Sequence, residues 1–198
     1  MKLFVCFFLT CAALFAALLT HVTLADAGRP LMDDGTDYVG PYTLSLSDRN
    51  VAALCIDFTD DVQVGDRWAA YVSPLEGSLA DTYHPDKRLA YEEEAYLYTL
   101  IIEPGADRIN LQHAAWSLTD SDYESDAAAT RWVLQAQQDY RTIDFAKFAV
   151  ISEAPGETGP RSQEFVAMTE TLEPSCINFM AGLMAISLAL LGRKRGGL

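Results

Sequence analysis

The sequence predicts an α+β fold, a small antiparallel β-sheet or barrel packed with about three helices. Two observations indicate this class. Segments between residues 41 and 72 alternate apolar and polar side chains with period two or are apolar on both faces, which is typical of strands. Between residues 89 and 140, apolar side chains instead recur at helical spacing. The chain has 198 residues, and without its apolar ends it suits one domain, expected at residues 28–152.

The first half of this domain reads as strands. Residues 41–46 alternate with period two and predict a half-buried strand. Residues 51–58 are apolar on both faces for most of their length, which favours a central strand, and the turn residues at 47–50 predict a hairpin between the two. A third strand is expected over 67–72. The Pro-, Gly-, Asp- and His-containing segment 73–87 is expected to be a loop.

The second half is mostly helical. Over 89–103, apolar and aromatic side chains recur at i, i+4, i+7 and i+11, which predicts a helix with a core-facing stripe. Its acidic run, 92–94, lies near the helix start, where acids suit the helix dipole, and is interpreted as a solvated face. Two further helices are expected over 107–118 and 126–140, and a last strand over 145–151.

The N-terminus has the order of parts of an export signal. Lys2 precedes an apolar run over residues 3–19, and the Ala-Asp-Ala sequence at 25–27 offers a small-residue cleavage site. We therefore expect residues 1–27 to be a signal peptide that is cleaved, with the mature chain beginning near that site. An uncleaved transmembrane anchor is the alternative.

The C-terminus carries a second apolar run. Residues 177–191 are followed by three basic residues, and the run is shorter than a stable membrane-spanning helix usually is. Residues 153–171, which are acidic and contain Pro, are expected to be a flexible linker to a tail at 172–198. The residues of the tail that form its signal are Glu173, Pro174, Ser175, Arg193, Lys194 and Arg195.

This order of short motif, apolar helix and basic stop resembles the PEP-CTERM sorting tail of Gram-negative bacteria, which an exosortase cuts at the Pro-containing motif. The resemblance implies export, transient insertion into the inner membrane through the C-terminal helix, and an exosortase-like partner. It further implies delivery to the cell surface or the extracellular matrix. An ordinary C-terminal membrane anchor, positive side inward, remains the alternative.

Composition and missing motifs exclude several functions. The chain has 14 Lys and Arg against 28 Asp and Glu, and such an acidic protein lacks the basic footprint of a nucleic-acid binder. His84 and His113 are the histidines of the expected domain, too few for a multi-histidine zinc site. No nucleophile elbow or phosphate-binding glycine loop occurs. The acids of 57–66 do not follow the spacing of an EF-hand loop and are interpreted as a solvated loop. We therefore expect no enzyme activity, cofactor or metal.

One thiol stands apart from the others. Cys6 and Cys11 lie in the expected signal peptide and Cys176 in the tail, so Cys55 is the lone cysteine of the exported domain, where an unpaired thiol is unusual. On the helix over 107–118, helical spacing directs Gln112 inward. A buried amide needs a partner, and a thiol held against a carboxamide can condense with it to a thioester.

The two segments Leu54-Cys55-Ile56, on a strand, and Leu-Gln-His-Ala-Ala-Trp at 111–116, on a later helix, resemble the paired signatures of bacterial surface thioester domains. The resemblance implies an internal thioester between Cys55 and Gln112 and covalent adhesion to amine-bearing partners. His113, next to Gln112, is expected at most to assist proton transfer. The alternative is that Cys55 is a buried apolar residue and Gln112 satisfies a backbone group, in a non-reactive structural protein of the matrix or biofilm.

Overall fold

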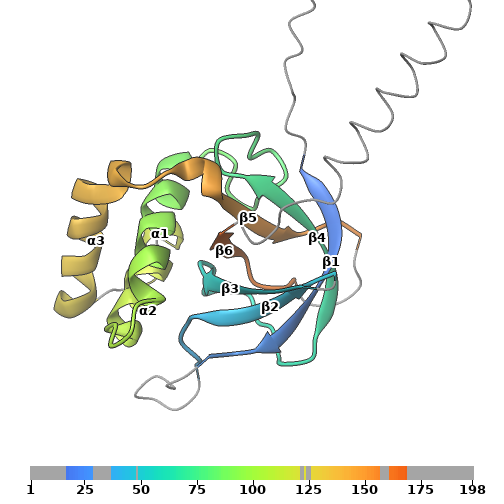
Figure 1. Ribbon diagram of the computed structural model, residues 1–198, viewed down its shortest axis with the longest axis horizontal. Coiled ribbons are helices and arrows are strands. Elements are labelled where there is room, and N and C mark those ends of the chain that lie inside the picture. The colour runs from blue at the N-terminus through green and yellow to red at the C-terminus, as the bar shows by residue number, and fades with distance from the viewer. Residues whose placement is uncertain are drawn as a thin grey trace, which may run out of the picture.

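The protein is a closed six-stranded antiparallel barrel with three helices packed against one side (Figure 1). The structure, a computed structural model, describes residues 17–28, 37–47, 49–120, 123, 126–156 and 161–168. The predicted class, an α+β fold with a small barrel and about three helices, is confirmed. Most of the expected signal peptide and the whole expected sorting tail lie outside the described residues.

The barrel closes in the order β1, β2, β3, β6, β5, β4, and every pair of neighbours is antiparallel. The strands are β1 (Leu18–Asp26), β2 (Tyr42–Leu46), β3 (Arg49–Cys55), β4 (Arg67–Pro74), β5 (Phe148–Glu153) and β6 (Phe165–Met168). The predicted β2–β3 hairpin is confirmed, with Ser47 in the left-handed conformation at its turn. β5 begins later than expected because Phe145–Lys147 forms a short 3₁₀ turn.

Strand β1 lies outside the limits expected for the domain. Leu18–Asp26 pairs with both β2 and β4, and Val22 and Leu24 are fully buried inside the barrel. The expected domain start at residue 28 is therefore too late. The period-two pattern of these residues was hidden because they follow directly on an apolar run, which reads as part of the export signal.

Strand β6 shows that the expected C-terminal limit of the domain, residue 152, is too early. Residues 153–171 were expected to be a flexible acidic linker, but Phe165–Met168 pairs with β3 and β5 and closes the barrel. Glu164, just before it, is fully buried and accepts hydrogen bonds from the Tyr91 hydroxyl (2.7 Å) and the Tyr83 backbone N–H (2.8 Å). A strand of four residues between acidic stretches is too short for a periodic signal, so only pairing with its neighbours reveals it.

The helices form an insertion between β4 and β5, at the three places predicted from spacing. They are α1 (Arg88–Ile101), α2 (Arg108–Thr119) and α3 (Ala127–Asp139). α1 and α2 contact β3, α1 also contacts β6, and α3 packs against the outside of these two helices (Figure 1). Within the described part of the chain, no helix combines the length and apolar character needed to cross a membrane.

Two apolar cores meet at β3. Val51, Ala53 and Cys55 point into the barrel, whereas Leu54 belongs to the core between the barrel and the helices. The prediction that this strand is apolar on both faces is confirmed. Trp116 of α2 also belongs to the barrel core, so helix α2 contributes directly to the interior at the end of β3.

The acidic run of α1 is not a solvated face. Glu93 is 5% exposed and Glu94 is fully buried, because α1 packs against the barrel on one side and against α2 and α3 on others. Neither carboxylate oxygen of Glu94 has a hydrogen-bond partner among the described residues. Burial, and next the charge of Glu164, raise the pKa of Glu94 well above its ordinary value.

This carboxyl makes the stability of the protein depend on pH. The pKa of Glu94 is higher in the folded than in the unfolded chain, so folding binds a proton and the free energy of unfolding falls as the pH rises above about 4.5. We expect Glu94→Gln to weaken this fall and to stabilise the protein at pH 8 by about 1–3 kcal/mol. Urea unfolding at pH 5 and pH 8 measures both effects, with the exposed Glu103→Gln as control. An unchanged pH dependence in Glu94→Gln would contradict the assignment.

Candidate functional site

Cys55 is the last residue of β3 and has no exposed surface. Its thiol donates a hydrogen bond to the carbonyl oxygen of Asp57, at 3.2 Å, and the indole N–H of Trp116 points at the sulfur from 3.5 Å. In the described part of the chain Cys55 is the free cysteine. The sulfur is thus held in a dry site by one acceptor and one donor.

Gln112 lies one helical turn before Trp116 on α2 and is also fully buried, as predicted. Its amide Nε2 donates to the carbonyl oxygen of Cys55, at 2.6 Å. Its Oε1 accepts from the backbone N–H of Gly40, at 3.1 Å. Helix and strand therefore bring the Gln112 carboxamide onto the residue that carries the thiol, and both ends of the amide are fixed.

Gly40 leaves little space for a side chain beside the Gln112 amide. A Cβ atom built on Gly40 would lie 3.3 Å from Gln112 Oε1 and 3.3 Å from Cδ1 of Ile101. Both contacts are tighter than side chains usually accept, so a larger residue would require the Gln112 carboxamide and the Ile101 side chain to shift by a few tenths of an ångström. The glycine lets its N–H approach the carboxamide oxygen closely.

The electrostatics of the site keep the thiol protonated. Burial raises the pKa of Cys55 to about 12, and the hydrogen bonds from Trp116 and to Asp57 oppose this only in part. At neutral pH the sulfur therefore carries its proton, and a fully buried thiol of this kind is inert toward reagents in solution.

The arrangement suits an intramolecular acyl transfer. The thiol can add to the amide carbon of Gln112, and the Gly40 N–H already donates to the oxygen on which negative charge would develop. Expulsion of the amide nitrogen, with the thiol proton, would release ammonia and leave a thioester. The carboxamide is fixed against the Cys55 backbone, and proximity of this kind would supply the effective concentration for such a step.

Aromatic rings cover this pair on the side of Trp116. Phe58 and Tyr123 contact the indole with ring centroids 5.0 Å and 5.5 Å away, and the His113 ring stacks on it at 6.1 Å. The structure thus places His113 against Trp116, half-buried. Whether its imidazole assists proton transfer stays a prediction. Trp116 itself is buried, as expected of a core residue, and in addition contacts the sulfur.

Sequence reasoning missed three groups of this site: the Gly40 N–H, the Asp57 carbonyl and the indole N–H of Trp116. Two of them are backbone atoms, which leave no trace in residue type. Asp57, interpreted as part of a solvated loop, is 5% exposed, and its Oδ1 accepts from the Thr59 backbone. Among the described residues, no group of three or more His, Cys, Asp and Glu side chains is placed to hold a metal ion.

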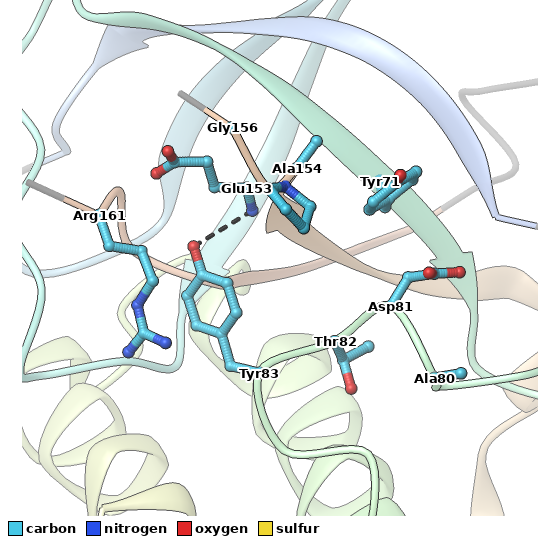
Figure 2. Close-up of a pocket in the computed structure, with 10 residues that line it drawn as sticks. Tyr71, Ala80, Asp81, Thr82, Tyr83, Glu153, Ala154, Gly156 and Arg161 are labelled. Atoms are coloured by element: carbon cyan, nitrogen blue, oxygen red, sulfur yellow. Dashed lines mark hydrogen bonds between the residues drawn. The ribbon is translucent and has the colours of Figure 1, made fainter. Parts of the chain in front are cut away.

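A cavity of about 450 Å³ lies away from the Cys55–Gln112 pair, between the segments around Tyr83 and Glu153. Figure 2 shows the Glu153 backbone N–H donating to the Tyr83 hydroxyl, at 3.2 Å. The Arg161 guanidinium lies 3.9 Å from the Tyr83 ring centroid. These groups contact one another and hold the segment before β6 against the segment around Tyr83. The residues that line this cavity therefore have a structural role.

The fold and the site together define a closed barrel with a helical insertion, in which a helix-borne carboxamide donates to the backbone carbonyl of a cysteine at a strand end. Comparisons of the chain with protein-family models, with curated proteins and with solved structures found no match.

Proposed function

We propose that Cys55 and Gln112 form an internal thioester through which the protein attaches covalently to amine-bearing partners. The observation that carries the proposal is the seating of the Gln112 amide between the Gly40 N–H and the carbonyl of Cys55. The contact places the Gln112 carboxamide against the backbone of the residue that carries the free thiol of the described chain. The chemistry is a single covalent capture and not turnover, so the protein is proposed to be an adhesin and not an enzyme.

Reaction with a small amine tests this proposal. Methylamine is expected to attack the acyl carbon of Gln112, because a thioester is an activated acyl group. The products are N-methylglutamine at position 112 and a free thiol at Cys55. Mass spectrometry of the corresponding peptide measures the adduct, and Gln135, half-buried on α3, is the control. If methylamine is incorporated at neither Gln112 nor Gln135, the thioester is contradicted. The same holds if it is incorporated at Gln135 as readily as at Gln112.

Export and surface delivery complete the proposal. The basic residue and apolar run at the N-terminus and the PEP-CTERM resemblance support a protein that crosses the inner membrane, is held there transiently, and reaches the cell surface or matrix. Cleavage at residues 25–27 would remove β1, so a cut that leaves the barrel intact must fall before Leu18. Peptide mapping of surface-exposed protein for Arg193, Lys194 and Arg195 distinguishes a removed tail from a permanent anchor. The second candidate, a non-reactive structural matrix protein, is favoured by the raised pKa of Cys55, which makes the reduced thiol inert.

A further inference from the structure

The first and last strands of the barrel place their free ends on the same side of the molecule. All neighbouring strands are antiparallel, so the starts of β1, β3 and β5 and the ends of β2, β4 and β6 gather at one end of the barrel. β1 begins there at Leu18, and β6 ends there at Met168. In Figure 1 the start of β1 lies at the top of the barrel. This end is the chain-end face of the barrel.

Apolar sequence flanks the barrel on both sides of this face. The N-terminal apolar run, residues 3–19, continues without a linker into β1. Residues 169–176 separate Met168 from the second apolar run, 177–191, and a segment of this length spans at most about 29 Å when fully extended. In the proposed function the second run enters the inner membrane, and the first run does so before any cleavage. Both connections therefore bring the chain-end face to the membrane.

Two exposed leucines lie on the chain-end face, which is an observation independent of the flanking runs. Leu18 and Leu19 are 54% and 58% exposed. By the alternation of a strand, Leu18 shares the face of β1 on which Val22 and Leu24 point into the barrel, so its exposure places it at the rim of the barrel mouth. Adjacent exposed apolar groups mark a surface that contacts a membrane or a protein.

The Cys55–Gln112 pair lies at the opposite end of the barrel. Cys55 is the last residue of β3, which starts on the chain-end face. The loop from β3 to β4 lies at the same end as Cys55 and exposes Asp61 and Asp66, which the anionic lipids of a membrane surface would repel. β1 has nine residues, so with the usual rise and tilt of barrel strands the two ends lie roughly 20 Å apart.

We propose that the chain-end face rests on a lipid bilayer, with Leu18 and Leu19 in its interfacial layer, and that the Cys55–Gln112 pair points away from the membrane. The inference rests on the membrane stage of the proposed function. The contact is end-on, because Leu18 lies at the barrel mouth and both flanking runs leave from that end. A partner then reaches the pair from the aqueous side while the protein is still held at the membrane.

Photo-crosslinking of the full chain in vesicles of phosphatidylethanolamine and phosphatidylglycerol tests this orientation. The photoreactive residue p-benzoylphenylalanine is placed at Asn50 or at Val64, which are both exposed and far in sequence from the apolar runs. Asn50 lies near the start of β3 on the chain-end face, and Val64 lies in the loop at the opposite end. Because roughly 20 Å separates the two ends, we expect about tenfold more lipid adduct at Asn50, measured by mass spectrometry.

A variant tests the role of the two leucines. Leu18→Asp/Leu19→Asp replaces exposed side chains, so the barrel is expected to fold, and charged groups leave the interfacial layer. The lipid adduct at Asn50 should then fall about threefold or more, whereas Val64→Asp, at the opposite end, should leave it unchanged. An adduct that the leucine variant does not lower would overturn the inference.

The other outcomes separate the inference from the proposed function. If the chain floats with the vesicles but Asn50 and Val64 give equal lipid adducts, the orientation is wrong and the membrane stage stands. Cross-links from Asn50 to a second copy of the chain in place of lipid would also overturn the inference. If the chain does not float with the vesicles, the membrane stage of the proposed function fails, and the inference fails with it.

Discussion

Purified wild-type protein is expected to weigh one molecule of ammonia less than its sequence, and Cys55→Ala and Gln112→Ala are each expected to show the full mass of their own sequences. The reason is that the thiol and the carboxamide are both consumed in one bond. Removal of either partner leaves the other unreacted, so the effect is complete and not graded. Gln163→Ala, which removes a half-buried amide that donates to the Asp57 carbonyl, is the matched control and should keep the mass deficit.

The state of the thiol supplies a second readout, which must be taken in denaturant. Cys55 is fully buried, so protection from alkylation in the native protein would follow from burial alone. In the unfolded wild-type chain, a peptide containing Cys55 should still resist alkylation until an amine opens the thioester. In Gln112→Ala it should be alkylated at once. A wild-type chain of full mass with an alkylated Cys55 would mean that no thioester forms and would favour the structural role.

The second large effect is expected at β1. A chain that begins at residue 28 lacks this strand, and β2 and β4 would each lose an antiparallel partner. The barrel interior would then be open to water, so we expect cooperative unfolding to be lost. A chain that begins at residue 18 should keep it. Thermal unfolding followed by circular dichroism measures the difference.

A point variant tests the same strand in the intact chain. Leu24 is fully buried, so Leu24→Ala should reduce the free energy of unfolding by about 2–5 kcal/mol. Thr23→Ala, at the adjacent half-buried position, should have a much smaller effect. If the chain from residue 28 unfolds with the same midpoint as the longer one, β1 is dispensable and cleavage after Ala27 is compatible with the barrel. Otherwise a processed chain must keep Leu18 onward.

The sequence predicted those elements whose periodicity is long enough to be unambiguous. The three helices and the strands β2, β3 and β4 follow from spacing alone. Strands β1 and β6 were missed because one continues an apolar run and the other has four residues among acids. In both, the hydrogen bonds that define the strand are made with residues far away in the chain. A local pattern carries no information about such pairing.

Glu94 shows that a local pattern also fails to predict the burial of a side chain. Three consecutive acids at a helix start look solvated in a sequence, and only the packing of α1 against both barrel and helices places Glu94 in the interior. Other interactions in the fold offset the free-energy cost of burying the Glu94 carboxyl. The residue type therefore predicts exposure, and the tertiary structure overrides that prediction.

For the candidate site, residue types and spacing by themselves determined the two side chains. Cys55 is the one thiol of the described chain, and helical geometry directs Gln112 inward, whatever lies opposite. Only the tertiary structure decided that the Gln112 carboxamide donates to the Cys55 carbonyl, since this contact joins a strand end to a helix 57 residues later. It also supplied the Gly40 N–H, because a backbone donor from a distant segment reaches the amide only when the chain is folded.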